Sequence, residues 1–357
     1  MEKIRVLVVG CGNMGASHAR AYNKLDEFEL VGIVDARAEA VEAFNKSVGG
    51  NYKHFSDYTK ALAELKPDAV AICTYPNTHE PLAIQALEAG CHVFVEKPIS
   101  STVEGAQRVV ACANKNNKKV VVGYILRHHP SWKKFIEIAR TLGKPLVMRM
   151  NLNQQSHGKT WQAHKNLLNS LTPIVDCGVH YLDVMCQMTG SKPVRVSGIE
   201  ANISNELNPE QRNYGQLQVA FEDGSIGWYE AGWGPMISTN AFFVKDVFGP
   251  KGCASITPKK ASNEKKSDEI DSHTKTEMIR LHHAETNADG DFAKEDEWIS
   301  TEDEPTHDDL CAREQLFLYN AIRNNEDLSR HMEDAINSLK IALAADESAR
   351  TGKMIYL

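Results

Sequence analysis

The sequence lacks the paired cysteines that mark disulfide-rich and zinc-binding proteins. Its eight cysteines are scattered, and no two of them stand in a C-x-x-C arrangement. Most lie within apolar runs, where a cysteine behaves as a small buried thiol. This pattern argues against disulfides and against a cysteine metal site, and it favours a reducing compartment.

The sequence also lacks long apolar runs, an excess of basic residues over acidic ones, and internal repeats. No run approaches the length of a membrane span, and the formal net charge is −7, whereas a nucleic acid or an anionic membrane requires a basic surface. The N-terminus enters a strand directly without a signal-peptide pattern, so we expect a cytoplasmic protein. The 357 residues, 42% of them hydrophobic, are enough for two domains with full cores.

A glycine-rich turn follows the first apolar run of the chain. Residues 4–9 are strongly apolar and lead into Gly10-Cys11-Gly12-Asn13-Met14-Gly15. In a strand–turn–helix unit the first glycine permits the reversal, the second admits a pyrophosphate, and the third lets the helix approach the strand. The first N–H groups of the helix then favour a phosphate. The turn therefore predicts a dinucleotide site that includes Asn13 and Met14.

A carboxylate at the end of the second predicted strand extends this site. Residues 30–34 are apolar and end at Asp35, where a carboxylate accepts hydrogen bonds from ribose hydroxyls. The alternative is that Asp35 caps the next helix. Asp35 repels a 2′-phosphate, which favours NAD over NADP, but Arg37 could pair with that phosphate and keeps NADP open.

The order of the predicted elements divides the chain near Gly123. Residues 1–123 alternate strand and helix at short spacing, which predicts a Rossmann domain with a parallel sheet. Residues 124–357 gather their strands together, which predicts an α+β domain with a large, mostly antiparallel, open sheet. The expected elements are helices at about 131–142, 173–189, 308–324 and 331–350, and strands at 145–152, 193–203, 214–221, 225–233, 239–248 and 252–256. Residues 258–277 and 285–309 are charged and predict solvated loops or edge hairpins.

Two further motifs follow predicted strands of the first domain. Thr74-Tyr75-Pro76-Asn77-Thr78-His79 and Glu96-Lys97-Pro98 each begin where a buried strand ends. Ligands of a doubly wound sheet bind beyond the carboxyl ends of its strands, so both loops are expected beside the cofactor. The structural alternatives are a turn with a helix cap for the first motif and a solvent-facing lysine for the second. The position of Lys97 at this edge favours a functional role.

Acidic and histidine side chains recur on a predicted helix of the second domain. Thr172 is a fitting N-cap and Pro173 suits the first helical position. Asp176, His180 and Asp183 then fall on one helix face, where Asp176 can orient His180 as a base. A structural Asp–His pair and a metal site are alternatives, although no further His or Cys cluster lies nearby, and we expect no metal. Gly178 within this helix indicates close approach by a backbone or a ligand.

A basic pair lies where the chain leaves the first domain. Arg127 and His128 follow Gly123 and precede a proline. They are expected to face a cleft between the domains, where they contact substrate or cofactor or hold the domains together. The sequence leaves these alternatives open.

Together these motifs resemble the glucose–fructose oxidoreductase, inositol dehydrogenase and rhizopine catabolism (Gfo/Idh/MocA) family of NAD(P)-dependent oxidoreductases. The resemblance covers essentially the whole chain, in order and spacing. It implies that Lys97 lies near the nicotinamide and the substrate hydroxyl, with Glu96 near the nicotinamide ribose. It also implies that Asp176 and His180 complete a catalytic set with Lys97. Trp161 falls where relatives often place an aromatic residue against the active site, and a core position is the alternative.

The sequence departs from the family pattern before the second-domain helix. Many members have two or three glycines there, whereas this chain has Asn169-Ser170-Leu171-Thr172-Pro173. The departure changes the expected rim of the substrate pocket.

The resemblance implies hydride transfer between a nicotinamide and a secondary alcohol or ketone of a sugar, glycoside or cyclic polyol. The implied cofactor is NAD, with NADP possible. Two alternatives are an enzyme that cleaves a glycoside through transient oxidation and a non-enzymatic nucleotide-binding regulator. Intact Lys97, Asp176 and His180 argue against the regulator. The open sheet predicts a homodimer or homotetramer built through its uncovered face.

Overall fold

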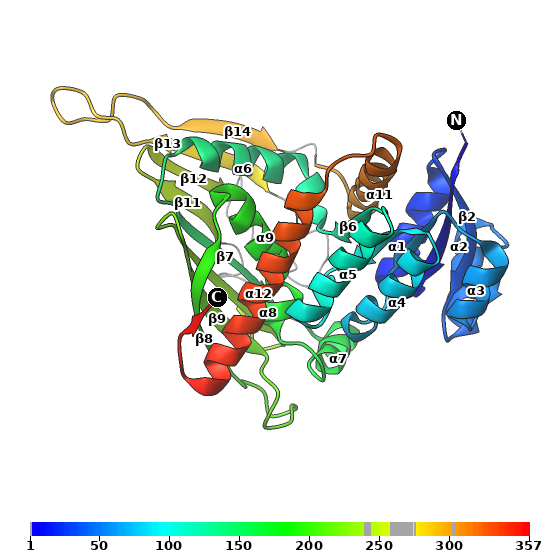
Figure 1. Ribbon diagram of the computed structural model, residues 1–357. Helices are drawn as coiled ribbons and strands as arrows, with labels where there is room; N and C mark the ends of the chain where they lie inside the picture. Colours follow the sequence, from blue (N-terminus) through cyan, green and yellow to red (C-terminus); the bar gives the residue numbers. More distant parts are fainter. Residues whose placement is uncertain (1, 239–243, 258–273, 275, 302–303) are drawn as a thin grey trace. The chain divides into compact units, whose positions relative to one another are not determined.

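The chain folds into two compact units, each made of two stretches of sequence. The computed structural model describes residues 2–238, 244–257, 274, 276–301 and 304–357 (Figure 1). Unit 1 comprises Met1–Ile125 and Pro305–Ile336, and unit 2 comprises Leu126–Glu304 and Asn337–Leu357. The sequence placed the division at residue 123, close to the first of these boundaries. It assigned residues 305–336 to the second domain, whereas they pack within unit 1.

Unit 1 is built on a six-stranded parallel sheet, which confirms the predicted Rossmann domain. Its strands are Ile4–Val9 (β1), Phe28–Val34 (β2), His54–Phe55 (β3), Ala69–Ile72 (β4), His92–Glu96 (β5) and Val120–Gly123 (β6). Their order is β3-β2-β1-β4-β5-β6. Every residue of β4 and β6 is buried, as expected for strands covered by helices on both faces.

Helices surround this sheet. They are Asn13–Lys24 (α1), Ala38–Val48 (α2), Tyr58–Leu65 (α3), Pro76–Glu88 (α4), Val103–Lys115 (α5), His307–Arg323 (α11) and the first part of Ser329–Thr351 (α12). Their starts have local causes: the Asp57 side chain caps α3, and Thr306 forms a capping box with Asp309 at α11. Helix α11 packs beside α1, and its Leu318 joins the apolar core under β1.

The strand order fixes where a ligand can bind in unit 1. The chain moves outward from β1 to β2 and β3, then returns to the other side of β1 with β4. The carboxyl ends of β1 and β4 therefore flank the switch point of the sheet, where ligands bind in this architecture.

Unit 2 contains a nine-stranded, mostly antiparallel sheet, as predicted. Its strands are Val147–Gln154 (β7), Pro193–Ala201 (β8), Tyr214–Phe221 (β9), Ile226–Trp233 (β10), Lys245–Gly249 (β11), Gly252–Thr257 (β12), Glu277–His283 (β13), Glu297–Thr301 (β14) and Ile355–Tyr356 (β15). Their order is β14-β13-β12-β11-β7-β10-β9-β8-β15, and only β7 and β10 are parallel neighbours among them. The strand predicted over 239–248 starts at Lys245 in the described chain, and residues 239–243 and 258–273 lie outside the described residues.

The helices of unit 2 depart from the predicted pattern in two places. They are Pro130–Thr141 (α6), Gly158–Leu167 (α7), Pro173–Asp176 (α8), Gly178–Thr189 (α9) and the end of α12, after a 3₁₀ turn at Ile125–His128 (η1). The single helix predicted over 173–189 is thus divided at Cys177, and α7 was not predicted. A side chain at Gly178 would lie 3.0 Å from the Tyr229 ring, so the close neighbour expected at this glycine is an aromatic side chain. None of the described helices has the length and apolar character of a membrane span.

Candidate functional site

The three glycines of the first turn have different surroundings. Gly10 has φ +89°, and a Cβ there would lie 2.5 Å from the Cys73 carbonyl oxygen; a Cβ at Gly15 would lie 1.9 Å from the Gly10 oxygen. A Cβ at Gly12 would have nothing within 4 Å. Gly10 and Gly15 therefore permit packing within the fold, whereas Gly12 leaves an open approach to the backbone.

The start of α1 is suited to a phosphate. Gly12 is its N-cap residue, so no side chain caps this end, and the first turn carries no acidic residue. The first N–H groups of a helix lack partners within the helix, and the dipole makes this end positive. Exposed Gly12 and Asn13 and half-buried Met14 lie at this end. The turn thus fits the pyrophosphate of a dinucleotide.

Asp35 connects the end of β2 to the glycine turn. Its Oδ2 accepts a hydrogen bond from the Cys11 amide at 2.7 Å, and its Oδ1 accepts one from the Arg37 amide at 2.8 Å. The N-cap of α2 is Arg37, so Asp35 is not a cap of that helix. The exposed Arg37 side chain lies 3.7 Å from the same carboxylate. A carboxylate fixed beside the turn fits the adenosine ribose.

The second loop is held to the third by a buried histidine. His79 places Nδ1 2.7 Å from the Pro98 oxygen and Nε2 3.0 Å from the Thr74 oxygen, and burial lowers its pKa. Both ring nitrogens thus face backbone carbonyls, so His79 holds the two loops together. Pro76 begins α4 and Asn77 is exposed on its first turn.

The third loop begins at the buried last residue of β5. The Glu96 carboxylate has Oε1 2.6 Å from His18 Nε2, and its Oε2 accepts a hydrogen bond from the Lys97 amide at 3.2 Å. Lys97 is half-buried and follows β5 at the carboxyl edge of the sheet, the same edge as the glycine turn. Position at this edge is what the sequence predicted for Lys97.

Polar side chains from α1 and α11 lie behind Glu96, and sequence reasoning missed them. Gln315 Nε2 lies 2.9 Å from His18 Nδ1, and the Tyr22 hydroxyl donates to Gln315 Oε1. Glu314 is also buried here, and desolvation together with the Glu96 charge raises its pKa. Ligand atoms of His18, Cys311 and Glu314 lie within 4.8 Å of one another, but hydrogen bonds already engage both ring nitrogens of His18, which disfavours a metal.

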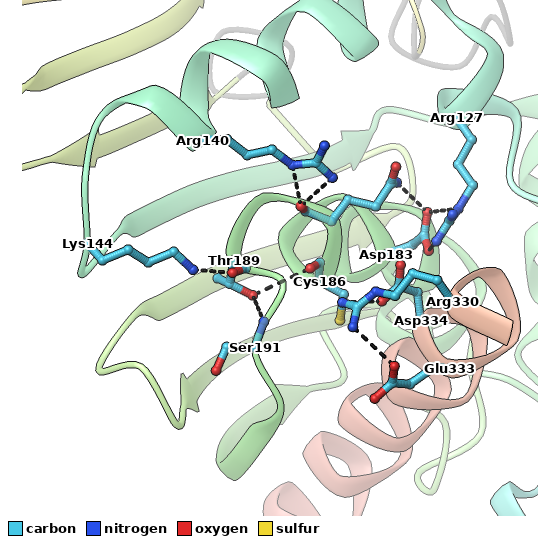
Figure 2. Close-up of polar contacts among 11 residues, drawn as sticks. Arg127, Arg140, Lys144, Asp183, Cys186, Thr189, Ser191, Arg330, Glu333 and Asp334 are labelled. Atoms are coloured by element: carbon cyan, nitrogen blue, oxygen red, sulfur yellow. Dashed lines mark hydrogen bonds and ion pairs between the residues drawn. The ribbon is translucent and has the colours of Figure 1, made fainter.

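In unit 2, Arg127 forms a forked ion pair with Asp183 (Figure 2). Arg127 Nε donates to Asp183 Oδ2 at 2.8 Å, and Nη2 donates to Oδ1. The Gln187 amide donates to the same carboxylate at 2.9 Å. Asp183 is fully buried, and removing one partner of such a pair costs about 3–5 kcal/mol. Ligand contact and holding the domains together were the roles expected for Arg127, whereas these bonds hold η1 to α9 within unit 2. The neighbouring His128 is buried.

Asp176 and His180 flank the helix break. Both are half-buried: Asp176 ends α8, and His180 lies in the first turn of α9. The Cys177 thiol between them lies 3.6 Å from Asp176 Oδ2 and 3.5 Å from Gln154 Oε1. Cys177 itself keeps right-handed helical backbone angles, φ −88° and ψ −36°, between the two helices.

An aromatic and polar group extends from Gln154 into the helices of unit 2. Trp233 Nε1 donates to Gln154 Oε1 at 2.7 Å, and His164 stacks on the Trp233 ring with centroids 4.4 Å apart. Trp161, which was predicted from the resemblance, is buried on the same helix as His164. Gln154, His164 and Trp233 were not predicted, since they are far apart in sequence and share no motif.

Lys245 is a second functional candidate that the sequence did not reveal. It is fully buried, and this desolvation lowers its pKa to about 7. Its ammonium donates to the Asn151 carbonyl and lies 4.9 Å from the centroid of the Tyr181 ring, next to His180 in the chain. A lysine in this environment titrates near neutrality.

The predicted site residues thus form two groups. Unit 1 brings together the glycine turn, Asp35, the loop ending at His79 and the Glu96–Lys97 pair. Unit 2 contains Arg127, His128, Trp161, Asp176 and His180.

Comparison with protein families identifies both parts of the chain. Residues 4–124 match the model of an oxidoreductase family with an NAD-binding Rossmann fold, and residues 136–357 match the C-terminal alpha/beta domain of the same family. The two matches together cover nearly the whole chain.

Related proteins and solved structures agree with this match. The chain is 26% identical to D-glucoside 3-dehydrogenase of Escherichia coli, over 71% of this chain and 77% of that protein. It is 29% identical to inositol 2-dehydrogenase/D-chiro-inositol 3-dehydrogenase of Lacticaseibacillus casei, over 67% and 76%. Its fold is similar to that of scyllo-inositol dehydrogenase from Lactobacillus casei, solved with NAD(H) and scyllo-inositol: TM-score 0.77, 21% identity, 99% of each chain covered.

Proposed function

We propose that this chain, which belongs to the Gfo/Idh/MocA family of NAD-binding oxidoreductases, oxidises a secondary alcohol of a sugar, glycoside or cyclic polyol. In the reverse direction it reduces the corresponding ketone. The dehydrogenases to which it is similar act, by their names, on a glucoside and on inositols. NAD is the favoured cofactor because Asp35 opposes a 2′-phosphate, and Arg37 leaves NADP possible.

We assign the chemical roles as follows. His180 takes the hydroxyl proton as general base, and Asp176 orients it. Lys97 donates a hydrogen bond to the same oxygen and stabilises its developing negative charge. When bound, NAD accepts the hydride that leaves the carbinol carbon. The products are then the ketone, NADH and the protonated base. Trp161 and His128, both buried, are assigned to the wall of the proposed substrate site, and Arg127 supports that wall through its ion pair with Asp183.

One observation carries the proposal most directly. Lys97 follows β5 at the edge of the sheet that also carries the open glycine turn and Asp35. A lysine there is placed at the edge where a nicotinamide cofactor binds in this architecture.

A substrate panel tests the proposed activity. Inositols, pyranoses and glycosides are incubated with NAD or NADP, and NADH absorbance is recorded together with sugar release. We expect net NADH from at least one polyol or sugar, more with NAD than with NADP. Sugar release without net NADH would instead identify the redox-neutral glycoside-cleaving reaction. Nucleotide binding without turnover across the panel would count for a regulator.

We also propose that a second copy of the chain covers the outward face of the nine-stranded sheet. Apolar side chains are exposed along it, including Ile199 on β8 (63% exposed), Ile226 on β10 (48%) and Tyr356 on β15 (76%). A hollow of about 270 Å³ lies on the same face, lined by Arg149, Gln218 and Trp228 among others. Light scattering is expected to give a dimer or tetramer; a 39.7 kDa particle at micromolar concentration would contradict the proposal.

A further inference from the structure

The buried hydrogen bonds behind Glu96 form a chain with a definite direction. The Tyr22 hydroxyl donates to Gln315 Oε1, which leaves the Gln315 amide nitrogen facing His18. An amide nitrogen is only a donor, so His18 Nδ1 accepts at 2.9 Å. In a neutral ring the proton then lies on Nε2, which donates to Glu96 at 2.6 Å. Three residues thus select one tautomer and direct one N–H at one carboxylate oxygen.

Both oxygens of Glu96 are fixed by this arrangement. The His18 ring holds Oε1, and the amide of Lys97 donates to Oε2 at 3.2 Å. The His18 ring is itself fully buried and packs on Phe94 of β5 with ring centroids 4.6 Å apart. A rotation of the Glu96 carboxylate would therefore break a buried contact and disturb the backbone from which Lys97 projects.

We propose that His18 and Gln315 are positioning residues for the reaction: they hold Glu96 ionised and in one orientation, and through the Lys97 amide they set the position of Lys97. The proposal rests on the proposed function, in which Lys97 contacts the reacting oxygen. It assigns a role to α11, because Gln315 comes from this helix near the end of the chain.

The charges around Glu96 agree with this role. The titratable groups that face it from the elements packed around it are His18 of α1, Cys311 and Glu314 of α11, Cys73 after β4, His79 of α4 and its neighbour Lys97. Burial raises the pKa of the Cys73 and Cys311 thiols, which keeps them neutral, and it lowers that of His79. Burial and the Glu96 charge raise the pKa of Glu314. The raised pKa favours the protonated form of Glu314, whereas Glu96 has the N–H donors that favour its carboxylate.

The first test measures Glu96 without any substrate. Carbon-13 labelling of glutamate side chains follows its ionisation by NMR in the full chain, and nitrogen-15 labelling of histidine reports the His18 ring. We expect a neutral His18 with the proton on Nε2 and an ionised Glu96 at neutral pH. Replacing His18→Met removes the donor, so the Glu96 midpoint is expected to move to higher pH. A charged His18, a proton on Nδ1, or an unmoved midpoint would overturn the proposal.

The second test uses a substrate found in the panel. His18→Met is expected to lower kcat at least about tenfold and to shift the acid limb of the pH profile upward, while KM for NAD changes less than about threefold. His18→Gln keeps an N–H donor and is expected to restore part of kcat. His92→Gln is the matched control, since His92 lies at the opposite, amino end of β5 and bonds the Lys119 amide.

The two tests separate the possible failures. If wild-type protein turns over no substrate, the proposed function fails, and the NMR result still decides whether His18 holds Glu96. If kcat falls equally in His18→Met and His18→Gln with the acid limb unmoved, His18 is only structural. If His18→Met does not fold, the His18 tautomer and the Glu96 ionisation measured in wild-type protein decide whether His18 holds Glu96. If purified wild-type protein contains one equivalent of zinc and folded His18→Met protein contains none, His18 is a zinc ligand. That result would exclude the positioning role of His18.

Discussion

Replacing Lys97→Met is expected to lower turnover by at least about a thousandfold, while the Kd for NAD changes less than about threefold. Methionine keeps much of the apolar length of lysine but can neither donate a hydrogen bond nor carry charge. The loss therefore falls on the transition state, where negative charge develops on the substrate oxygen. The buried Glu96 and the glycine turn stay in place, so cofactor binding is retained.

Steady-state kinetics and NADH fluorescence titration measure these two effects separately. Lys60→Met is the matched control, because Lys60 is exposed on α3 and should give wild-type values in both assays. Turnover within tenfold of wild type would remove Lys97 from the mechanism. An equal loss of NAD binding and turnover would make Lys97 a cofactor ligand without a separate chemical role.

Two alanine substitutions in the glycine turn are expected to fail in different ways. In Gly15→Ala the new Cβ would lie 1.9 Å from the Gly10 carbonyl oxygen. This neighbour belongs to the backbone, so it cannot move aside as a flexible side chain would. We expect unit 1 to lose about 3 kcal/mol of stability or more, and NAD binding with it. In Gly12→Ala the Cβ meets nothing within 4 Å, and φ is −73°, which alanine adopts without strain.

Gly12→Ala should therefore fold normally and bind NAD at least about tenfold more weakly, because its Cβ occupies the approach of the pyrophosphate. Thermal unfolding followed by circular dichroism reports stability, and NADH fluorescence reports binding. If Gly12→Ala binds NAD like wild type, the pyrophosphate does not approach this residue. If Gly15→Ala melts like wild type, the turn has more freedom than its packing indicates.

Local patterns were sufficient to predict the strands and turns of unit 1 up to residue 123, because each of their signals lies within a short stretch of chain. A buried strand followed by three spaced glycines predicts a strand, a turn and a helix regardless of the remaining sequence. Lys97 was placed correctly at the sheet edge for the same reason, since it directly follows a short apolar run. The Rossmann fold, the open antiparallel sheet and the NAD-binding family were all predicted in this way and are confirmed.

Contacts between distant residues could not be predicted from these patterns. One partner of His18 is Gln315, 297 positions away, and an isolated glutamine in a helix has no signature. The division of the helix at Cys177 was missed because a regular apolar period runs through residues 173–189. Lys245 was missed because lysine is normally exposed, and only the fold shows that this one is buried.

The nucleotide-binding unit is completed by a segment that the chain reaches only after passing through unit 2, and α12 then carries the chain from one unit into the other. Recombination at a single junction near residue 125 would transfer β1 to β6 without the helix that brings Gln315 and Leu318 to them. Exchange of an intact unit between relatives needs two crossovers, the second within a continuous helix. The two halves are thus expected to be inherited together.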